Sequence, residues 1–103
     1  MKACCKIWLE SYDGKFILGE GTAQLLHAIE EKGSLSEAAR LREISYAHAW
    51  RKIREIEKNL GTKVVKRRRG GKSGGSSFLT GEGKALLEEY EQLKKSVEAA
   101  LQV

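Results

Sequence analysis

The clearest apolar pattern in the chain lies in residues 44–61, ISYAHAWRKIREIEKNLG. Apolar side chains recur there at steps of four, three and four residues, and on an α-helix they form one stripe that must face a core. They are Ala49, Ile53, Ile56 and Leu60. Ser45 is a favourable N-cap and Gly61 a favourable residue after a last helical turn, so the pattern predicts a helix of about four turns between them.

The face opposite this stripe is cationic. It carries Ala47, Arg51, Arg54 and Lys58. A basic ridge on a helix held from behind, with a small residue near its N-terminus, suits insertion into a nucleic-acid groove. A solvated helix face is the alternative for a charge stripe that stands alone.

The N-terminal pattern predicts a β-hairpin and then a helix. Residues 6–11 and 15–18 are β-prone, and Asp13-Gly14 between them predicts a short turn. Residues 22–32 form an amphipathic helix that stops at a glycine. Its apolar face carries Leu25, Leu26 and Ile29.

A second, shorter helix is predicted directly after the first. Ser34 and Glu37 match a capping box, in which each side chain satisfies a free backbone N–H of the first turn. This helix runs to about Arg42, and about three residues separate it from Ser45. Two helices joined by so tight a turn, the second of them basic, indicate a helix-turn-helix.

After the basic helix, residues 63–67 and 77–79 are short β-prone segments. The stretch between them, residues 68–75, is rich in glycine and arginine and is expected to be a basic loop at the tip of a hairpin, a wing. A flexible linker is the alternative, but a linker has no need of three consecutive arginines between strand signals.

Thr80 caps a last helix that is predicted to reach Leu101. Its apolar residues follow the spacing of a coiled-coil seam, and about 20 residues span roughly 30 Å, more than a domain of this size needs to close its core. A dimer contact is the predicted use, and packing wholly within the chain is the alternative. The predicted dimer contacts are Leu86, Tyr90, Leu93, Val97 and Leu101.

Composition and charge limit the function classes. At 103 residues with 41% hydrophobic content the chain is one structural domain, without the apolar run of a membrane span or a secretory signal, so a cytoplasmic location is expected. The net charge is +5, but residues 45–80 carry ten Lys or Arg against two Glu, whereas the rest has nine basic and twelve acidic residues. Positive charge concentrated in this way favours a polyanionic partner.

No catalytic set is visible in the sequence. Residues 70–73, GGKS, resemble the end of a phosphate-binding loop, but Lys66 stands where that motif needs a glycine. His27 and His48 have no carboxylate or cysteine at metal or triad spacing, so we expect no enzyme, no metal and no cofactor. His48 flanks the basic ridge and either contacts DNA or is idle, and Trp50 is expected to pack between helix and hairpin rather than stack on a base.

Cys4 and Cys5 are adjacent, so a bond between them would strain the intervening peptide. On a strand their side chains point to opposite faces, which predicts that one is buried and one exposed. Two reduced thiols are one reading, and a disulfide between subunits near a two-fold axis is the other.

Several of these segments resemble a known family. The strings Ile44-Ser45-Tyr46, Ala49-Trp50 and Leu79-Thr80, together with Val65, Arg67 and the run GGKSGG at residues 70–75, resemble the N-terminal DNA-binding domain of ModE-type molybdate-responsive regulators. The stretch from Leu26 through GSLSEAA is similar to the winged helix-turn-helix of LysR-type regulators. The resemblance covers residues 6–101.

The resemblance implies a winged helix-turn-helix that dimerises through its last helix and binds duplex DNA. By position, its DNA contacts on the basic helix fall on Ser45, Tyr46, Ala47, His48, Arg51 and Lys52, and its wing contacts fall on Arg69, Gly71 and Lys72. Two departures are Glu43, at a turn where the family often has glycine, and the end of the sequence at Val103. Glu43 must accept a positive φ or another turn geometry. Without the molybdate-binding domain, no molybdate is expected as a ligand.

The sequence thus predicts a mainly α fold with small β elements: residues 1–80 form a hairpin plus winged helix-turn-helix, and residues 81–103 form a dimerisation helix. The predicted function is that of a homodimeric regulator of transcription, found with the nucleoid, in which Arg54, Lys58 and Arg68 add backbone contacts. An architectural protein that coats DNA without sequence preference is the first alternative. The second is an interaction module whose basic helix is incidental.

Overall fold

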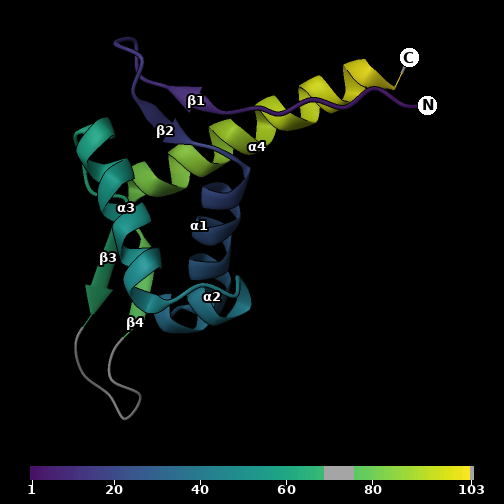
Figure 1. The fold of residues 1–103 in the computed structure, drawn as a ribbon. Helices are drawn as coiled ribbons and strands as arrows, with labels where there is room; N and C mark the ends of the chain where they lie inside the picture. The colour runs from purple at the N-terminus through teal and green to yellow at the C-terminus, as the bar shows by residue number, and fades with distance from the viewer. Residues whose placement is uncertain (69–75, 103) are drawn as a thin grey trace.

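Residues 1–68 and 76–102, the part of the chain that this computed structural model describes, form four helices and two antiparallel hairpins (Figure 1). The elements in chain order are β1 (Leu9–Glu10), β2 (Phe16–Leu18), α1 (Glu20–Lys32), α2 (Leu35–Leu41), α3 (Tyr46–Leu60), β3 (Val65–Arg68), β4 (Ser76–Leu79) and α4 (Gly81–Leu101). The predicted mainly α, winged helix-turn-helix fold is confirmed.

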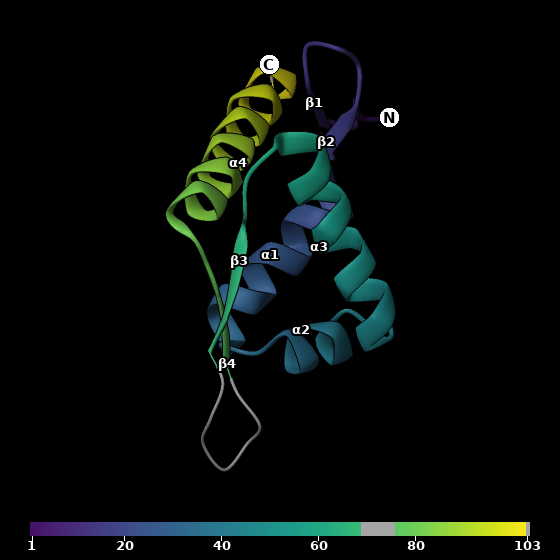
Figure 2. The same ribbon diagram turned by 90° about the vertical axis from the view of Figure 1, so that its left-hand side faces the viewer.

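The core lies around α1, which contacts α2, α3, α4 and β4. Its largest fully buried side chains include Leu25, Leu26, Ile29, Leu35, Ile53, Ile56 and Tyr90. The predicted stripe on α3 is confirmed for Ala49, Ile53 and Ile56, but Leu60 is 36% exposed. The last turn of α3 lies at the periphery beside the β1–β2 hairpin, beyond the reach of α1 (Figures 1 and 2).

Side-chain caps fix where three of the helices begin, as predicted. The hydroxyl of Ser34 accepts from the Glu37 N–H at 3.2 Å, which is the serine half of the predicted capping box. The hydroxyl of Ser45 accepts from the His48 N–H at 3.0 Å. Thr80 caps α4 in the same way. Helix α1 begins two residues earlier than predicted, because the Gly19 N–H donates to the side chain of Thr22, 2.9 Å away, inside the first turn.

The turn between α2 and α3 takes the first of the two geometries expected for it. Glu43 has φ +56°, in the left-handed region, and its N–H donates to the Arg40 carbonyl at 3.0 Å. The Ile44 N–H then donates to the Ala39 carbonyl at 3.0 Å. Residues 42–45 separate the two helices, and this short turn sets α3 across the end of α2 (Figure 2).

The N-terminal hairpin is shorter than predicted. Strand β1 is confined to Leu9–Glu10, because the pairing with β2 is irregular there and the turn already begins at Ser11, whose N–H donates to the Lys15 carbonyl at 2.8 Å. Residues 1–8 lie outside the strand, so the predicted alternation of Cys4 and Cys5 is wrong: both thiols are free and exposed.

The wing strands pair from Val65 opposite Leu79 to Arg68 opposite Ser76. Strand β3 begins two residues later than predicted, because the backbone carbonyls of residues 63 and 64 accept hydrogen bonds from Thr80, which follows β4. The Lys63 carbonyl accepts from the Thr80 hydroxyl at 2.7 Å, and the Val64 carbonyl accepts from the Thr80 N–H at 2.9 Å.

The two halves of α4 have different environments. Leu86, Leu87 and Tyr90 are buried in the chain's own core. The second half extends beyond the body of the molecule, where Leu93 is 40% and Leu101 38% exposed (Figure 1). This corrects the predicted dimer seam, because Leu86 and Tyr90 have almost no surface left for a second subunit.

Candidate nucleic-acid interface

Helix α3 presents its basic face outward. Ala47, Arg51, Arg54 and Lys58 are exposed, opposite the buried stripe, as the spacing predicts. Two polar side chains anchor the helix from behind, and neither role was predicted. Asn59 donates its amide to the Phe16 carbonyl at 2.8 Å, and the Glu57 carboxylate accepts from the Val64 and Val65 N–H groups at 2.9 and 3.3 Å.

The wing strand and α3 meet at Trp50. The guanidinium carbons of Arg54, on α3, and of Arg67, on β3, lie over its ring, 5.6 and 5.2 Å from the centroid. Tyr46 meets the same indole edge-on, with ring centroids 6.4 Å apart. Trp50 is half-buried and packs against the core, as expected, so positive side chains from two separate segments converge on one surface.

The other residues predicted to contact DNA lie on both sides of Trp50. Arg68 lies over the ring of Phe78 in the wing, at 5.6 Å. The Nδ1 of His48 lies 3.1 Å from the Arg51 guanidinium, so the two side chains are neighbours on this helix. Lys52 is half-buried on the other flank of α3, in a groove shared with the N-terminal hairpin.

The wing contacts predicted at Arg69, Gly71 and Lys72 lie outside the described residues. Among residues 1–68 and 76–102, no ion pair joins Arg51, Arg54 or Arg67 to a carboxylate. The positive charge on this face is therefore not neutralised by the acidic side chains of the same part of the chain, and it is available to an anion.

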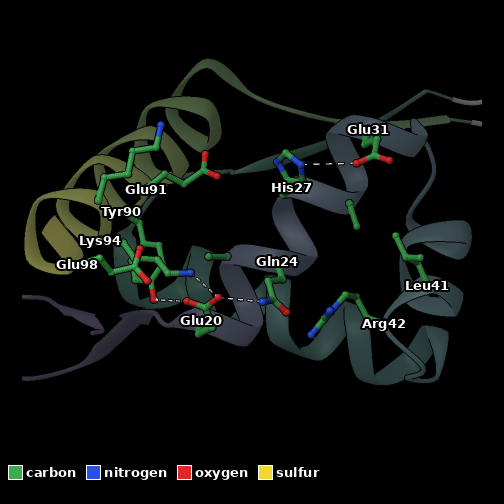
Figure 3. A pocket seen from close by; sticks show the side chains of 13 residues that line it. Glu20, Gln24, His27, Glu31, Leu41, Arg42, Tyr90, Glu91, Lys94 and Glu98 are labelled. Carbon is green, nitrogen blue, oxygen red and sulfur yellow. Dashed lines mark hydrogen bonds and ion pairs between the residues drawn. The ribbon is translucent and has the colours of Figure 1, made fainter. Parts of the chain in front are cut away.

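A second polar cluster lies between α1 and α4, where Lys94, Tyr90 and Gln24 all turn toward Glu20 (Figure 3). The Lys94 ammonium lies 2.9 Å from Glu20 Oε1, and the Tyr90 hydroxyl, shared with the Ile7 carbonyl, lies 3.2 Å from Oε2. The hydrogen bond from Lys94 lowers the pKa of Glu20, and burial raises the pKa of Tyr90. This cluster fixes α4 on α1.

Neither polar cluster has the composition of a metal site. The described residues contain no group of three or more His, Cys, Asp or Glu side chains that could hold a metal ion. No helix within residues 1–68 and 76–102 is both long enough and apolar enough to cross a membrane. The surface around Trp50, where Arg54 and Arg67 converge, is the candidate site for function.

A family model, the bacterial regulatory helix-turn-helix protein of the lysR family, matches residues 22–84, which include α2, the turn and α3. The chain belongs to this family. The match begins within α1 and ends in the first turn of α4, so it spans the helix-turn-helix and both wing strands.

Among curated proteins, this LysR-family chain is similar to the N-terminal part of ModE regulators. It is 32% identical over 80 residues to the transcriptional regulator ModE of Haemophilus influenzae, covering 78% of this chain and 31% of that protein. It is 37% identical over 79 residues to the DNA-binding transcriptional dual regulator ModE of Escherichia coli K12, covering 77% of this chain and 30% of that protein. The predicted resemblance is confirmed, and the chain spans less than a third of the length of these relatives.

Solved structures show the same fold. The CbnR DNA-binding domain, determined as a complex with DNA, has a TM-score of 0.62 at 23% identity, covering 79% of this chain and 88% of that one. ArgP from Mycobacterium tuberculosis also has a TM-score of 0.62 at 23% identity, covering 81% of this chain and 29% of that one.

Proposed function

We propose that this chain binds duplex DNA as a homodimer and regulates transcription, which would place it with the nucleoid in the cytoplasm. The observation that carries the proposal is the convergence of Arg54 and Arg67 at Trp50, beside the exposed Arg51 and Lys58. Helix α3 would enter the major groove, and the wing would follow the phosphate backbone. The ModE relatives named as transcriptional regulators and the CbnR domain solved with DNA support this assignment.

The second half of α4 supplies the proposed dimer contact. Leu93, Val97 and Leu101 recur every four residues along one side of the helix and are exposed or half-buried. With 21 residues, α4 spans about 30 Å, long enough to pair with its copy. A two-fold dimer would present two α3 helices to an operator with inverted-repeat symmetry.

The dimer contact is tested by sedimentation of Leu93→Glu. A charge at this position of a packed seam should shift the chain to monomer, whereas Ala99→Glu, on the exposed opposite side of the same helix, should leave the dimer intact. A Leu93→Glu variant that sediments like the unchanged chain would show that the dimer forms elsewhere, or that Leu93 does not contribute.

DNA binding is tested by selecting duplexes from a random pool and titrating selected and random duplexes at two salt concentrations. A dimer that neutralises about eight phosphates should show a slope of log K against log salt near −7, with tighter binding to an enriched inverted repeat. Equal binding to both duplexes with no salt dependence would overturn the proposal. Strong salt dependence with no enriched motif would identify an architectural protein instead.

A double variant separates DNA recognition from a protein-binding role. Arg51→Ala/Arg54→Ala removes two exposed cations and should abolish specific binding without unfolding the chain. Its charge-matched control is Lys84→Ala/Lys95→Ala, which removes two exposed lysines that belong to α4 and not to the basic face of α3. Equal affinities for the two double variants would leave the basic helix without a role in DNA binding.

A further inference from the structure

Trp50 is the point at which α3 and the wing strand hold each other. It contacts one guanidinium from its own helix, Arg54, and one from β3, Arg67. We infer that Trp50 is a positioning residue for DNA binding. It fixes the separation between Arg54 on the recognition helix and Arg67 on the wing strand. This inference rests on the proposed function and goes beyond it, because it assigns the geometry of the contact surface to one aromatic side chain.

The distances support an attraction between ring and cation. Both guanidinium carbons lie within about 6 Å of the ring centroid, the range in which the electron-rich face of an indole attracts a cation. Two like charges brought to one place would otherwise repel each other, so the ring also offsets the cost of their convergence. Arginine suits this role better than lysine, because its flat guanidinium can stack on a ring and still present N–H donors at its edge.

Anchoring also reduces the entropy cost of binding. An exposed arginine has a long, flexible side chain, and ordering it against a phosphate opposes association. Arg54 and Arg67 are exposed, but each is already directed by its contact with Trp50. DNA would thus meet two cations that are ordered in the free protein.

Trp50 complements a second link between the same two elements. Glu57 holds the backbone of Val64 and Val65, at the start of the wing strand. Trp50 acts two residues further along, on the side chain of Arg67. The first link fixes where the strand starts, and the second directs the part of the strand that faces outward.

A double-mutant cycle on DNA binding tests the inference. Trp50→Leu and Arg67→Gln should each weaken binding to a selected duplex about tenfold. Because Trp50 acts partly through Arg67, the double variant should fall well short of the roughly hundredfold loss that independent effects would give. Trp50→Phe, which keeps a smaller ring, should bind within about threefold of the unchanged chain. A full multiplicative loss, or Trp50→Leu binding as tightly as the unchanged chain, would overturn the inference.

A measurement without DNA separates this inference from the proposed function. Side-chain NMR signals of Arg54 and Arg67 should be displaced by the ring current of Trp50 in the free chain and should return to ordinary positions in Trp50→Leu. The matched control is Trp8→Leu, because Trp8 is exposed directly before β1 and hydrogen-bonds to Glu10. Displaced signals in a chain that does not bind DNA would overturn the proposed function and with it the positioning role. DNA binding without displaced signals would overturn the positioning role alone.

Discussion

Gly83, in the first turn of α4, is the position where the structure makes the sharpest demand on residue size. A Cβ added there would lie 2.2 Å from the Val64 carbonyl oxygen and 3.0 Å from its carbonyl carbon. Both atoms belong to the backbone, and the same carbonyl accepts from the Thr80 N–H at 2.9 Å. Gly83→Ala therefore cannot be accommodated by rotating a side chain, and α4 must move away from the segment that leads into the wing.

The expected loss follows from three contributions. Overpacking of this kind costs about 1–3 kcal/mol, and weakening the hydrogen bond from Thr80 costs about 1 kcal/mol more. Replacing glycine by alanine inside a helix stabilises the helix by about 1 kcal/mol, which offsets part of this loss. The net destabilisation is about 2 kcal/mol, which lowers the melting temperature of a domain of this size by roughly 10 °C.

Urea unfolding followed by circular dichroism, at one fixed protein concentration, measures this difference. Gly81→Ala is the matched control, because it lies in the same helical turn and a Cβ there meets nothing within 4 Å. It should leave the free energy of unfolding unchanged or raise it by a few tenths of a kcal/mol. If Gly83→Ala proved as stable as Gly81→Ala, the close approach of α4 to Val64 would be refuted.

Two further predictions concern the turn and the cluster at Glu20. Glu43→Gly should raise the free energy of unfolding by about 0.5–1 kcal/mol, because glycine adopts φ +56° without strain. Arg42→Gly, at φ −87°, should lower the free energy of unfolding. Urea unfolding of both variants checks these signs. The pKa of Glu20 is lowered in the folded chain by Lys94, so the stability that Glu20 contributes is present above its ordinary pKa of 4.5 and is lost as the pH falls through the lowered value. Unfolding measured from neutral to acidic pH should therefore show Glu20→Gln less stable at neutral pH and equal to the unchanged chain in acid; a constant difference across that range would contradict this.

Local sequence patterns were sufficient to place the helices and the turn between them. The capping residues Ser34, Ser45 and Thr80 act within the next three residues, and a glycine that ends a helix acts within its last turn. The cationic face of α3 could be predicted equally well from the sequence, because burying one side of a helix exposes the other. Helix-turn-helix topology and the outward direction of Arg51 and Arg54 could therefore be predicted.

The tertiary structure alone decided which residues meet across the fold. It placed Arg67 over Trp50 and placed the Glu57 carboxylate within hydrogen-bonding distance of the start of β3. It also brought side chains from α1 and α4 into contact with Glu20. It also divided the regular apolar series of α4 between the chain's own core and an exposed half. Periodicity shows which side of a helix is apolar, but it does not show where the neighbouring elements end, and that position determines whether an apolar side chain is buried within the chain or left exposed for a partner.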